Sequence, residues 1–191
     1  MIFDAEGNLY GDTNQGGMQK CKDIEGYPLG CGTVFELSPA DGGWTESILY
    51  NFTVNQDNYP AWPLTMGPNH MLYGTTPAYV FRLAPPSIAG EAWSYKTLYQ
   101  FPGLTLLTDS GVTFDAHGNL YGTGAGLSSE SSAFEISPPA QAGSPWTETR
   151  LGFVGYGYAL RGLIRGPFGA LYGATLGNEI TNYGSVFAIV Q

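Results

Sequence analysis

Short runs of alternating apolar and polar residues recur along this chain, separated by clusters of glycine, proline, asparagine and aspartate. Residues 133–137 (Ala-Phe-Glu-Ile-Ser) alternate with a period of two, and residues 146–151 (Trp-Thr-Glu-Thr-Arg-Leu) do so again. This alternation is typical of half-buried β-strands. Glycine and proline recur too often for long helices. The pattern therefore predicts an all-β protein made of short strands and many turns.

A Leu-Tyr-Gly motif occurs four times, and it organises the rest of the sequence. Its tyrosines stand at positions 10, 73, 121 and 172, which are 63, 48 and 51 residues apart. Each copy is followed by an apolar segment that contains a phenylalanine, at residues 33–37, 79–83, 133–136 and 185–189. Three copies continue into a further segment that begins with Trp44, Trp93 or Trp146. A period near 50 residues indicates a propeller or another repeat array.

The third repeat shows the expected build of one unit. Residues 111–115 and 120–123 predict two strands, and the Asp-Ala-His-Gly-Asn sequence between them predicts a tight turn. The two alternating segments described above add a third and a fourth strand. Four antiparallel strands per unit form the blade of a β-propeller.

We therefore predict one repeat domain, a β-propeller of four blade-like units at about residues 1–52, 53–101, 102–153 and 154–191. In a radial ring, Leu9, Leu72, Leu120 and Leu171 would occupy equivalent positions. A β-sandwich also has short strands at regular spacing, but it does not predict four matching units.

The two ends of the repeat pattern are uneven. The first unit begins directly in its first strand, and the last unit ends after its third strand, with no tryptophan-containing fourth. Either the ring closes on an incomplete blade, or a partner covers the edge, or the chain is part of a longer array. An uncapped strand edge is an interaction template, so we expect homo-oligomers or filaments through open strand edges.

The charge balance restricts the partners. The chain has 16 acidic and 7 basic residues, a net charge of −9, and only 12% charged residues. Nucleic-acid affinity depends on cations that neutralise phosphates, so nucleic acid is not expected as a partner. No apolar run is long enough to cross a bilayer, so membrane insertion is not expected either.

The only two cysteines, Cys21 and Cys31, lie in one loop. In an oxidising compartment they would form a disulfide, whereas a four-ligand zinc site is not available because no histidine lies near them. The two histidines, His70 and His117, fall in turns, and we expect no metal and no cofactor. We expect an extracellular or cell-surface location and a mature or trimmed chain, since the sequence shows no signal peptide.

The repeats resemble the GloVer tandem-repeat family of bacterial choice-of-anchor surface proteins. The resemblance lies in Asp-Ala-Glu-Gly-Asn-Leu-Tyr-Gly at 4–11, Gly16-Gly17, Cys-Gly-Thr-Val-Phe-Glu-Leu-Ser-Pro at 31–39 and Leu-Tyr-Asn-Phe at 49–52, and residues 115–123 repeat its first part. It covers nearly the whole chain. It implies export, attachment or release at the cell surface, and a propeller-like architecture, but no chemical activity.

Aromatic residues in the loops of one propeller face are the candidate ligand-binding residues. An aromatic ring offers a flat apolar face and a polar tip, which suits a sugar. The candidates lie in the connections that enter the second and fourth units: Tyr59, Trp62, Tyr156 and Tyr158. The alternative is that these rings pack between blades.

Carboxylates on the same face leave an enzyme open, because glycoside hydrolysis needs a carboxylate pair. The candidates are Asp12, Asp23, Glu25, Asp57, Asp109, Glu130 and Glu179. None recurs in every repeat, so no pair is singled out, and no catalytic residue is assigned. Asp4 and Asp115 do match each other, but both precede a Gly-Asn turn, which favours a structural role.

These observations favour a secreted or cell-surface, non-enzymatic β-propeller that acts as a binding or assembly module for glycans or another protein. A glycan-active hydrolase or lyase is the alternative. The two differ in whether a carboxylate pair lies across a cleft.

Overall fold

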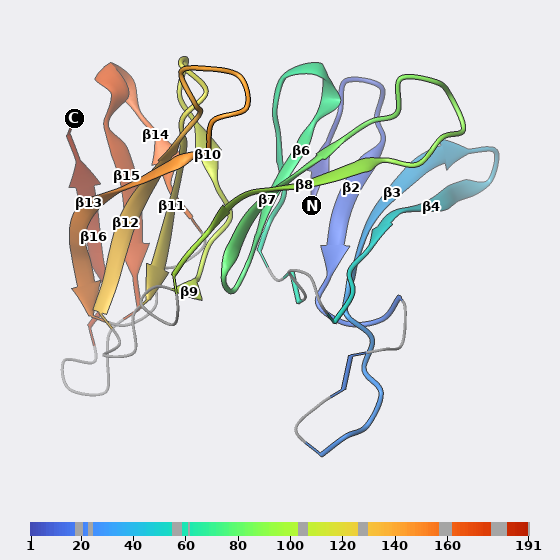
Figure 1. Cartoon of the computed structure of the whole chain (residues 1–191), viewed down its shortest axis with the longest axis horizontal. Helices are drawn as coiled ribbons and strands as arrows, with labels where there is room; N and C mark the ends of the chain where they lie inside the picture. The colour runs from blue at the N-terminus through green and yellow to red at the C-terminus, as the bar shows by residue number, and fades with distance from the viewer. Residues whose placement is uncertain are drawn as a thin grey trace. The chain divides into compact units, whose positions relative to one another are not determined.

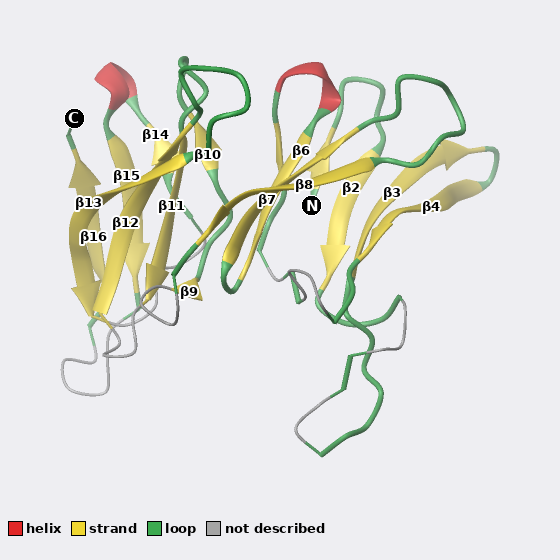
Figure 2. Ribbon diagram, viewed as in Figure 1, coloured by secondary structure: helices red, strands yellow, loops and turns green. Residues whose placement is uncertain are grey.

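The computed structural model describes most of the chain. The described residues are 1–17, 21–22, 25–54, 59–60, 62–102, 107–125, 130–156, 162–176 and 183–190, and for residues 107, 130 and 156 the backbone alone is described. The strands of these described residues lie in four separate antiparallel sheets, one for each predicted repeat (Figures 1 and 2). The prediction of an all-β protein of four matching units is confirmed at this level. No helix among the described residues is long and apolar enough to span a bilayer.

The first sheet has the order β1-β2-β3-β4, so each strand pairs with the next one along the chain. Its strands are β1 (Ile2–Phe3), β2 (Leu9–Thr13), β3 (Thr33–Ala40) and β4 (Gly43–Asn51). Asp41 and Gly42 form the two-residue turn between β3 and β4, where Gly42 has a positive φ of 87°. Glycine adopts this left-handed backbone without steric cost, which favours it at the second position of the turn.

The second sheet has the same order, β5-β6-β7-β8. It consists of β5 (Thr65–Met66), β6 (Leu72–Thr76), β7 (Tyr79–Ala84) and β8 (Ser94–Gln100). The 3₁₀ turn η1 (Pro68–His70) connects its first two strands, and Figure 2 shows it in red.

The third sheet follows the path β10-β11-β12-β13, and the short strand β9 (Leu107–Thr108) pairs with β11 off this path. The strands are β10 (Thr113–Phe114), β11 (Leu120–Ala125), β12 (Glu130–Ser137) and β13 (Thr147–Tyr156). All four strands predicted for this repeat are confirmed, with bounds that differ by a few residues. β9 was missed, because two residues are too few to show a period.

The fourth sheet has three strands among the described residues, in the order β14-β15-β16. They are β14 (Ile164–Arg165), β15 (Leu171–Thr175) and β16 (Ser185–Ile189), and η2 (Pro167–Gly169) connects the first two. In the other three sheets a fourth strand pairs with the third, but β16 has no such neighbour in the described part of the chain.

The Leu-Tyr-Gly motif has the same place in every sheet: it begins the second strand. Leu9 pairs with Leu37 and Gly11 with Phe35, so these side chains share one face, which we call the leucine face. Tyr10 pairs with Glu36 and Asp12 with Val34 on the opposite face, which we call the tyrosine face. The same two names apply to the equivalent residues of the other sheets.

The glycine of the motif is required by its phenylalanine partner. A Cβ built on Gly122 would lie 2.5 Å from Cζ of Phe134, and Gly11 and Gly74 would place a Cβ at the same distance from Phe35 and Phe81. The phenylalanine ring therefore lies directly over the glycine in each of these sheets. This packing explains why every repeat has glycine in its second strand and phenylalanine in its third.

Two core clusters show how neighbouring sheets pack. In the first, Tyr10 and Val34 from the tyrosine face of the first sheet cluster with residues from the leucine face of the second sheet, namely Leu64, Leu72, Phe81 and Leu83. In the second, Tyr121 and Ala133 of the third sheet cluster with Leu163 and Leu171 of the fourth. In both clusters, a tyrosine face packs against the leucine face of the next sheet. The chain divides into two compact units, residues 1–77 with 81–96 and residues 78–80 with 97–191, and one cluster lies in each.

Candidate functional site

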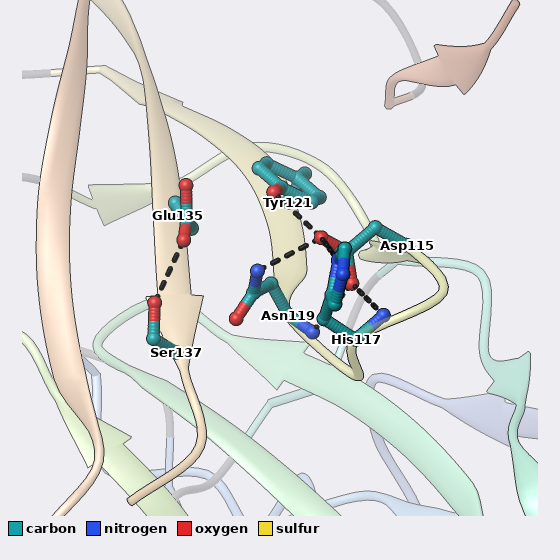
Figure 3. A network of polar contacts seen from close by, with 6 residues as sticks. All are labelled: Asp115, His117, Asn119, Tyr121, Glu135 and Ser137. Carbon is teal, nitrogen blue, oxygen red and sulfur yellow. Dashed lines mark hydrogen bonds and ion pairs between the residues drawn. The ribbon is translucent and has the colours of Figure 1, made fainter. Parts of the chain in front are cut away.

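The turn that Asp115 begins contains the most extensive polar network in Figure 3. Oδ1 of Asp115 accepts hydrogen bonds from the backbone N–H groups of His117 (2.8 Å) and Asn119 (2.9 Å). Oδ2 accepts hydrogen bonds from Nδ2 of Asn119 (2.8 Å) and the hydroxyl of Tyr121 (3.0 Å). On the neighbouring strand, Ser137 donates to Glu135 at 2.7 Å. The Asp115 carboxylate thus accepts four hydrogen bonds from its own turn and from the motif tyrosine.

The first repeat contains the same network. Oδ1 of Asp4 accepts from the backbone N–H groups of Glu6 and Asn8, and Oδ2 accepts from Nδ2 of Asn8 and the hydroxyl of Tyr10. Burial by itself would raise the pKa of Asp4 and of Asp115, but the hydrogen bonds outweigh it and hold both pKa values below the ordinary value. Burial and the nearby Glu36 and Asp4 carboxylates raise the pKa of Tyr10, so this hydroxyl stays protonated. The geometry supports a structural role for both aspartates.

The second and fourth repeats form the same turn without a carboxylate. In all four turns the N–H of the first residue donates to the carbonyl of the fifth, as in Asp115 to Asn119 and Gly166 to Ala170. In η2, Phe168 and Gly169 have a positive φ, and in η1 Asn69 and His70 do. Two turn types therefore alternate along the chain, Asp-x-x-Gly-Asn in the first and third repeats and Gly-Pro in the second and fourth.

One group of side chains in the first unit has the spacing of metal ligands. One ligand atom each of Asp4, Glu6 and His70 lie within 4.8 Å of one another. Glu6 and His70 are exposed, and each oxygen of Asp4 already accepts two hydrogen bonds. A cation at this position would have to displace donors that hold the turn together.

The predicted ligand-binding aromatics are described to different extents. Tyr158 lies outside the described residues, and of Tyr156 only the backbone, at the end of β13, is described. Trp62 is half-buried just before β5, and it has interactions with other residues. Ligand binding by these residues therefore stays a prediction.

Tyr59 connects the second repeat to the disulfide loop. Its backbone N–H donates to the carbonyl of Cys31 (3.0 Å), and its hydroxyl donates to the carbonyl of Lys22 (3.3 Å). The ring packs against the core cluster of the first unit, and the backbone has a positive φ of 62°. A left-handed backbone is uncommon for tyrosine, so these contacts fix its place. No pattern in the sequence indicated them, because the partners are distant backbone carbonyls.

The predicted disulfide between Cys21 and Cys31 is present in the structure, with a Cα–Cα distance of 5.0 Å. Both cysteines are buried in the core cluster of the first unit. Backbone hydrogen bonds from Leu29 to Cys21, from Gly16 to Leu29 and from Gly32 to Gly16 hold the two ends of the loop together.

The candidate carboxylates do not share one environment. Asp109 is buried and accepts a hydrogen bond of 2.7 Å from the hydroxyl of Thr123, whereas Glu25 is exposed. Asp12 lies on the tyrosine face of the first sheet, where burial raises its pKa to about 6. The remaining candidates are outside the described residues or have no described side chain: Asp23, Asp57, Glu130 and Glu179.

The tyrosine face of the fourth sheet is exposed. Ile164 is 71% exposed, Tyr172 39% and Val186 83%, whereas in the first sheet Tyr10 is 5% exposed and Val34 is fully buried. The equivalent residues of the second and third sheets are also buried: Tyr73, Val80, Tyr121 and Ala133. This surface was not predicted from the sequence, although the missing tryptophan-containing segment marked the fourth repeat as incomplete.

The leucine face of the first sheet is exposed at residues 1 and 3, in and just before β1. Met1 is 72% exposed, whereas its equivalents Leu64, Val112 and Leu163, each just before a first strand, are buried. Phe3 is 64% exposed, whereas its equivalents Met66 and Phe114 are half-buried. A contiguous apolar surface on a folded domain commonly marks an interaction site. The tyrosine face of the fourth sheet and the leucine face of the first sheet are therefore the candidate functional surfaces of this chain.

No protein-family model matches this chain, and no curated protein matches its sequence.

Proposed function

We propose that this chain is an extracellular, non-enzymatic module of β-propeller type that binds or assembles through its exposed apolar and aromatic surfaces. The observation that carries the proposal is the exposed tyrosine face of the fourth sheet, where Tyr172 and Val186 occupy positions that are apolar or aromatic and buried in the other repeats, and where Ile164 is exposed beside them. Such a face is stabilised when another surface removes it from water, at about 25 cal/mol per Å² of apolar area.

The polar groups that recur between repeats support a binding role over catalysis. Asp4 and Asp115 use all four of their acceptor positions inside their turns. A general base or nucleophile needs a carboxylate oxygen that can reach a substrate. These two aspartates are therefore poor candidates for chemistry.

The extracellular location rests on the Cys21–Cys31 disulfide, because disulfides persist in oxidising compartments. The resemblance to GloVer repeats supports the same location and the propeller-type arrangement. With a net charge of −9, the preferred ligands are neutral, such as glycans, or proteins.

A glycan array and a turnover screen on the same polysaccharides test this function. We expect retained glycans or a bound protein with no release of reducing ends or unsaturated products. Turnover of any polysaccharide, abolished by removal of a carboxylate such as Asp12, would overturn the non-enzymatic assignment in favour of a glycan-active hydrolase or lyase.

Trp62→Ala tests the predicted aromatic contact. A stacked aromatic ring contributes on the order of 1 kcal/mol beyond its buried area, so we expect glycan affinity to fall about fivefold. Trp44→Ala is the matched control, because Trp44 is an exposed tryptophan on the outer strand β4. Binding is measured by isothermal titration calorimetry and folding by thermal melting. A large fall in melting temperature for Trp62→Ala with unchanged affinity would assign Trp62 to the core.

A further inference from the structure

The exposed face of the fourth sheet has the same side chains as a covered face elsewhere in the chain. Ile164, Tyr172 and Val186 stand at the positions that Ile2, Tyr10 and Val34 occupy in the first sheet, so the residue types are identical. Ile2, Tyr10 and Val34 all belong to the core cluster of the first unit or pack against it. The fourth sheet therefore presents one face of a sheet-to-sheet contact that is complete in the first unit. We call this contact, a tyrosine face packed against a leucine face, a joint.

The other half of that joint is the leucine face of the second sheet. It covers the first sheet with the residue just before β5 and with residues of β6 and β7: Leu64, Leu72, Phe81 and Leu83. Leu64 packs over the motif glycine, since its Cδ2 would lie 2.9 Å from a Cβ built on Gly74.

The first sheet presents an equivalent leucine face. Met1, Leu9, Phe35 and Leu37 occupy the positions of Leu64, Leu72, Phe81 and Leu83. Met1 packs as Leu64 does, because its Cγ would lie 3.0 Å from a Cβ built on Gly11. Met1 and Phe3 are largely exposed, and the other three are half-buried where their counterparts are buried.

We propose that two copies of this chain join head to tail, with the leucine face of the first sheet of one copy covering the tyrosine face of the fourth sheet of the other. The new joint would use the apolar residue types of the joint between the first and second sheets, with Met1 in place of Leu64. This proposal rests on the proposed assembly function and names its partner, a second copy of the chain. The contact is heterologous, so two copies close a ring or many copies build a filament.

The polar residues of the exposed face are compatible with such a joint. In the first sheet Asp4 and Glu36 surround the Tyr10 hydroxyl, whereas the fourth sheet has Gly166 and Ala188 at these positions. The tyrosine face of the fourth sheet therefore has no carboxylate at either position, and covering it desolvates no charge there.

Two single substitutions test the proposal, one on each face. Val186→Asp places a charge on the tyrosine face of the fourth sheet, and Phe3→Asp places one on the leucine face of the first. Both residues are exposed, so neither change should unfold the chain. Ile88→Asp is the matched control, because Ile88 is an equally exposed apolar residue in the connection between β7 and β8.

Sedimentation velocity over a concentration series gives the readout. We expect the wild type and Ile88→Asp to exceed the 20.4 kDa of one chain as concentration rises, and each face variant to associate at least about tenfold more weakly. An equimolar mixture of Val186→Asp and Phe3→Asp should recover a species of two chains and no larger one. Each mixed pair retains one unchanged tyrosine face and one unchanged leucine face.

Three outcomes would overturn the head-to-tail joint. The first is a wild type that stays at 20.4 kDa at every concentration. The second is a mixture that fails to associate. The third is a Val186→Asp chain that melts at a lower temperature as a monomer, which would show that the face is covered within one chain. If the wild type is monomeric but still binds a glycan or a protein, the head-to-tail contact is wrong and the proposed binding function is retained.

Discussion

Asp115 and Asp4 show how a repeated acidic residue can serve the fold alone. Each carboxylate takes the two backbone N–H groups of its turn and the hydroxyl of the motif tyrosine. The carboxylate therefore links a turn to the strand that follows it. Where glycine replaces aspartate, a Gly-Pro turn reaches the same geometry through backbone bonds and left-handed residues.

Asp115→Asn should reduce stability in a manner that depends on pH. The pKa of Asp115 is lowered in the folded chain, so its carboxylate stabilises the fold above the ordinary pKa near 3.8, and this contribution is lost as pH falls through the folded pKa. The asparagine side chain keeps one acceptor oxygen. Its amide N–H₂ group would replace the oxygen that accepts from Nδ2 of Asn119 and the hydroxyl of Tyr121, so donors would face donors. We expect a loss of about 1–3 kcal/mol at pH 7 and a much smaller loss near pH 2, measured by urea unfolding.

Asp41→Asn is the control for this measurement. Asp41 is exposed in the turn between β3 and β4, so its replacement should change the free energy of unfolding by less than about 0.5 kcal/mol. An equal loss at pH 7 and pH 2 for Asp115→Asn would contradict the ionised network.

At the scale of a single sheet, the pairing of glycine with phenylalanine defines the repeat. The tyrosine and leucine of the motif point to opposite faces, and the glycine leaves room for the ring of the third strand. A glycine in a strand interior normally weakens the strand. Here the ring packed over it recovers apolar burial, because Phe81 and Phe134 are fully buried.

Gly122→Ala should therefore destabilise the third sheet. The new methyl group would lie 2.5 Å from Cζ of Phe134, so the ring must move, and overpacking of this kind costs about 1–3 kcal/mol. Gly43→Ala is the matched control, because a Cβ on Gly43 in β4 meets nothing within 4 Å. Chemical denaturation compares the two.

A double-mutant cycle extends this test. In a Phe134→Leu background the Gly122→Ala change should cost less, since the shorter side chain leaves room for the methyl group. Strictly additive losses would show that the ring is not the source of the effect.

At the scale of the whole molecule, each compact unit is stabilised by contacts between neighbouring sheets, because one sheet alone would leave its apolar faces in water. Each tyrosine face in the two core clusters is covered by the sheet that follows it. Repeat proteins gain much of their stability from such interfaces between neighbouring repeats.

The Cys21–Cys31 disulfide should contribute measurably to the stability of the first unit. The two cysteines are 10 residues apart, which gives a chain-entropy contribution of about 3 kcal/mol. The Cys21→Ser, Cys31→Ser double variant should unfold at a correspondingly lower urea concentration.

Intact-mass measurement tests the same disulfide in protein recovered from outside the cell. Alkylation before reduction should add nothing to the mass, and alkylation after reduction should modify both cysteines. Two thiols that react without reduction would contradict both the disulfide and the extracellular location.

The sequence alone determined the elements of this protein. Period-two alternation and turn residues act locally, so they specify the four repeats and the hairpin turns, and the close spacing of Cys21 and Cys31 specifies their pairing. The matching Asp4 and Asp115 also pointed correctly to turns. The contacts of Tyr59 could not be predicted, because distant backbone carbonyls leave no trace in the residue pattern.

The tertiary structure decided which faces are covered. Tyr172 and Val186 are the same residue types as Tyr10 and Val34, and both pairs stand in the same Leu-Tyr-Gly and Val-Phe segments. Their burial differs because burial depends on what packs above a sheet, and the sheet that covers Tyr10 and Val34 comes from the next repeat along the chain. A strand's own sequence specifies which side chains share a face, whereas the neighbouring sheet determines whether that face is core or surface.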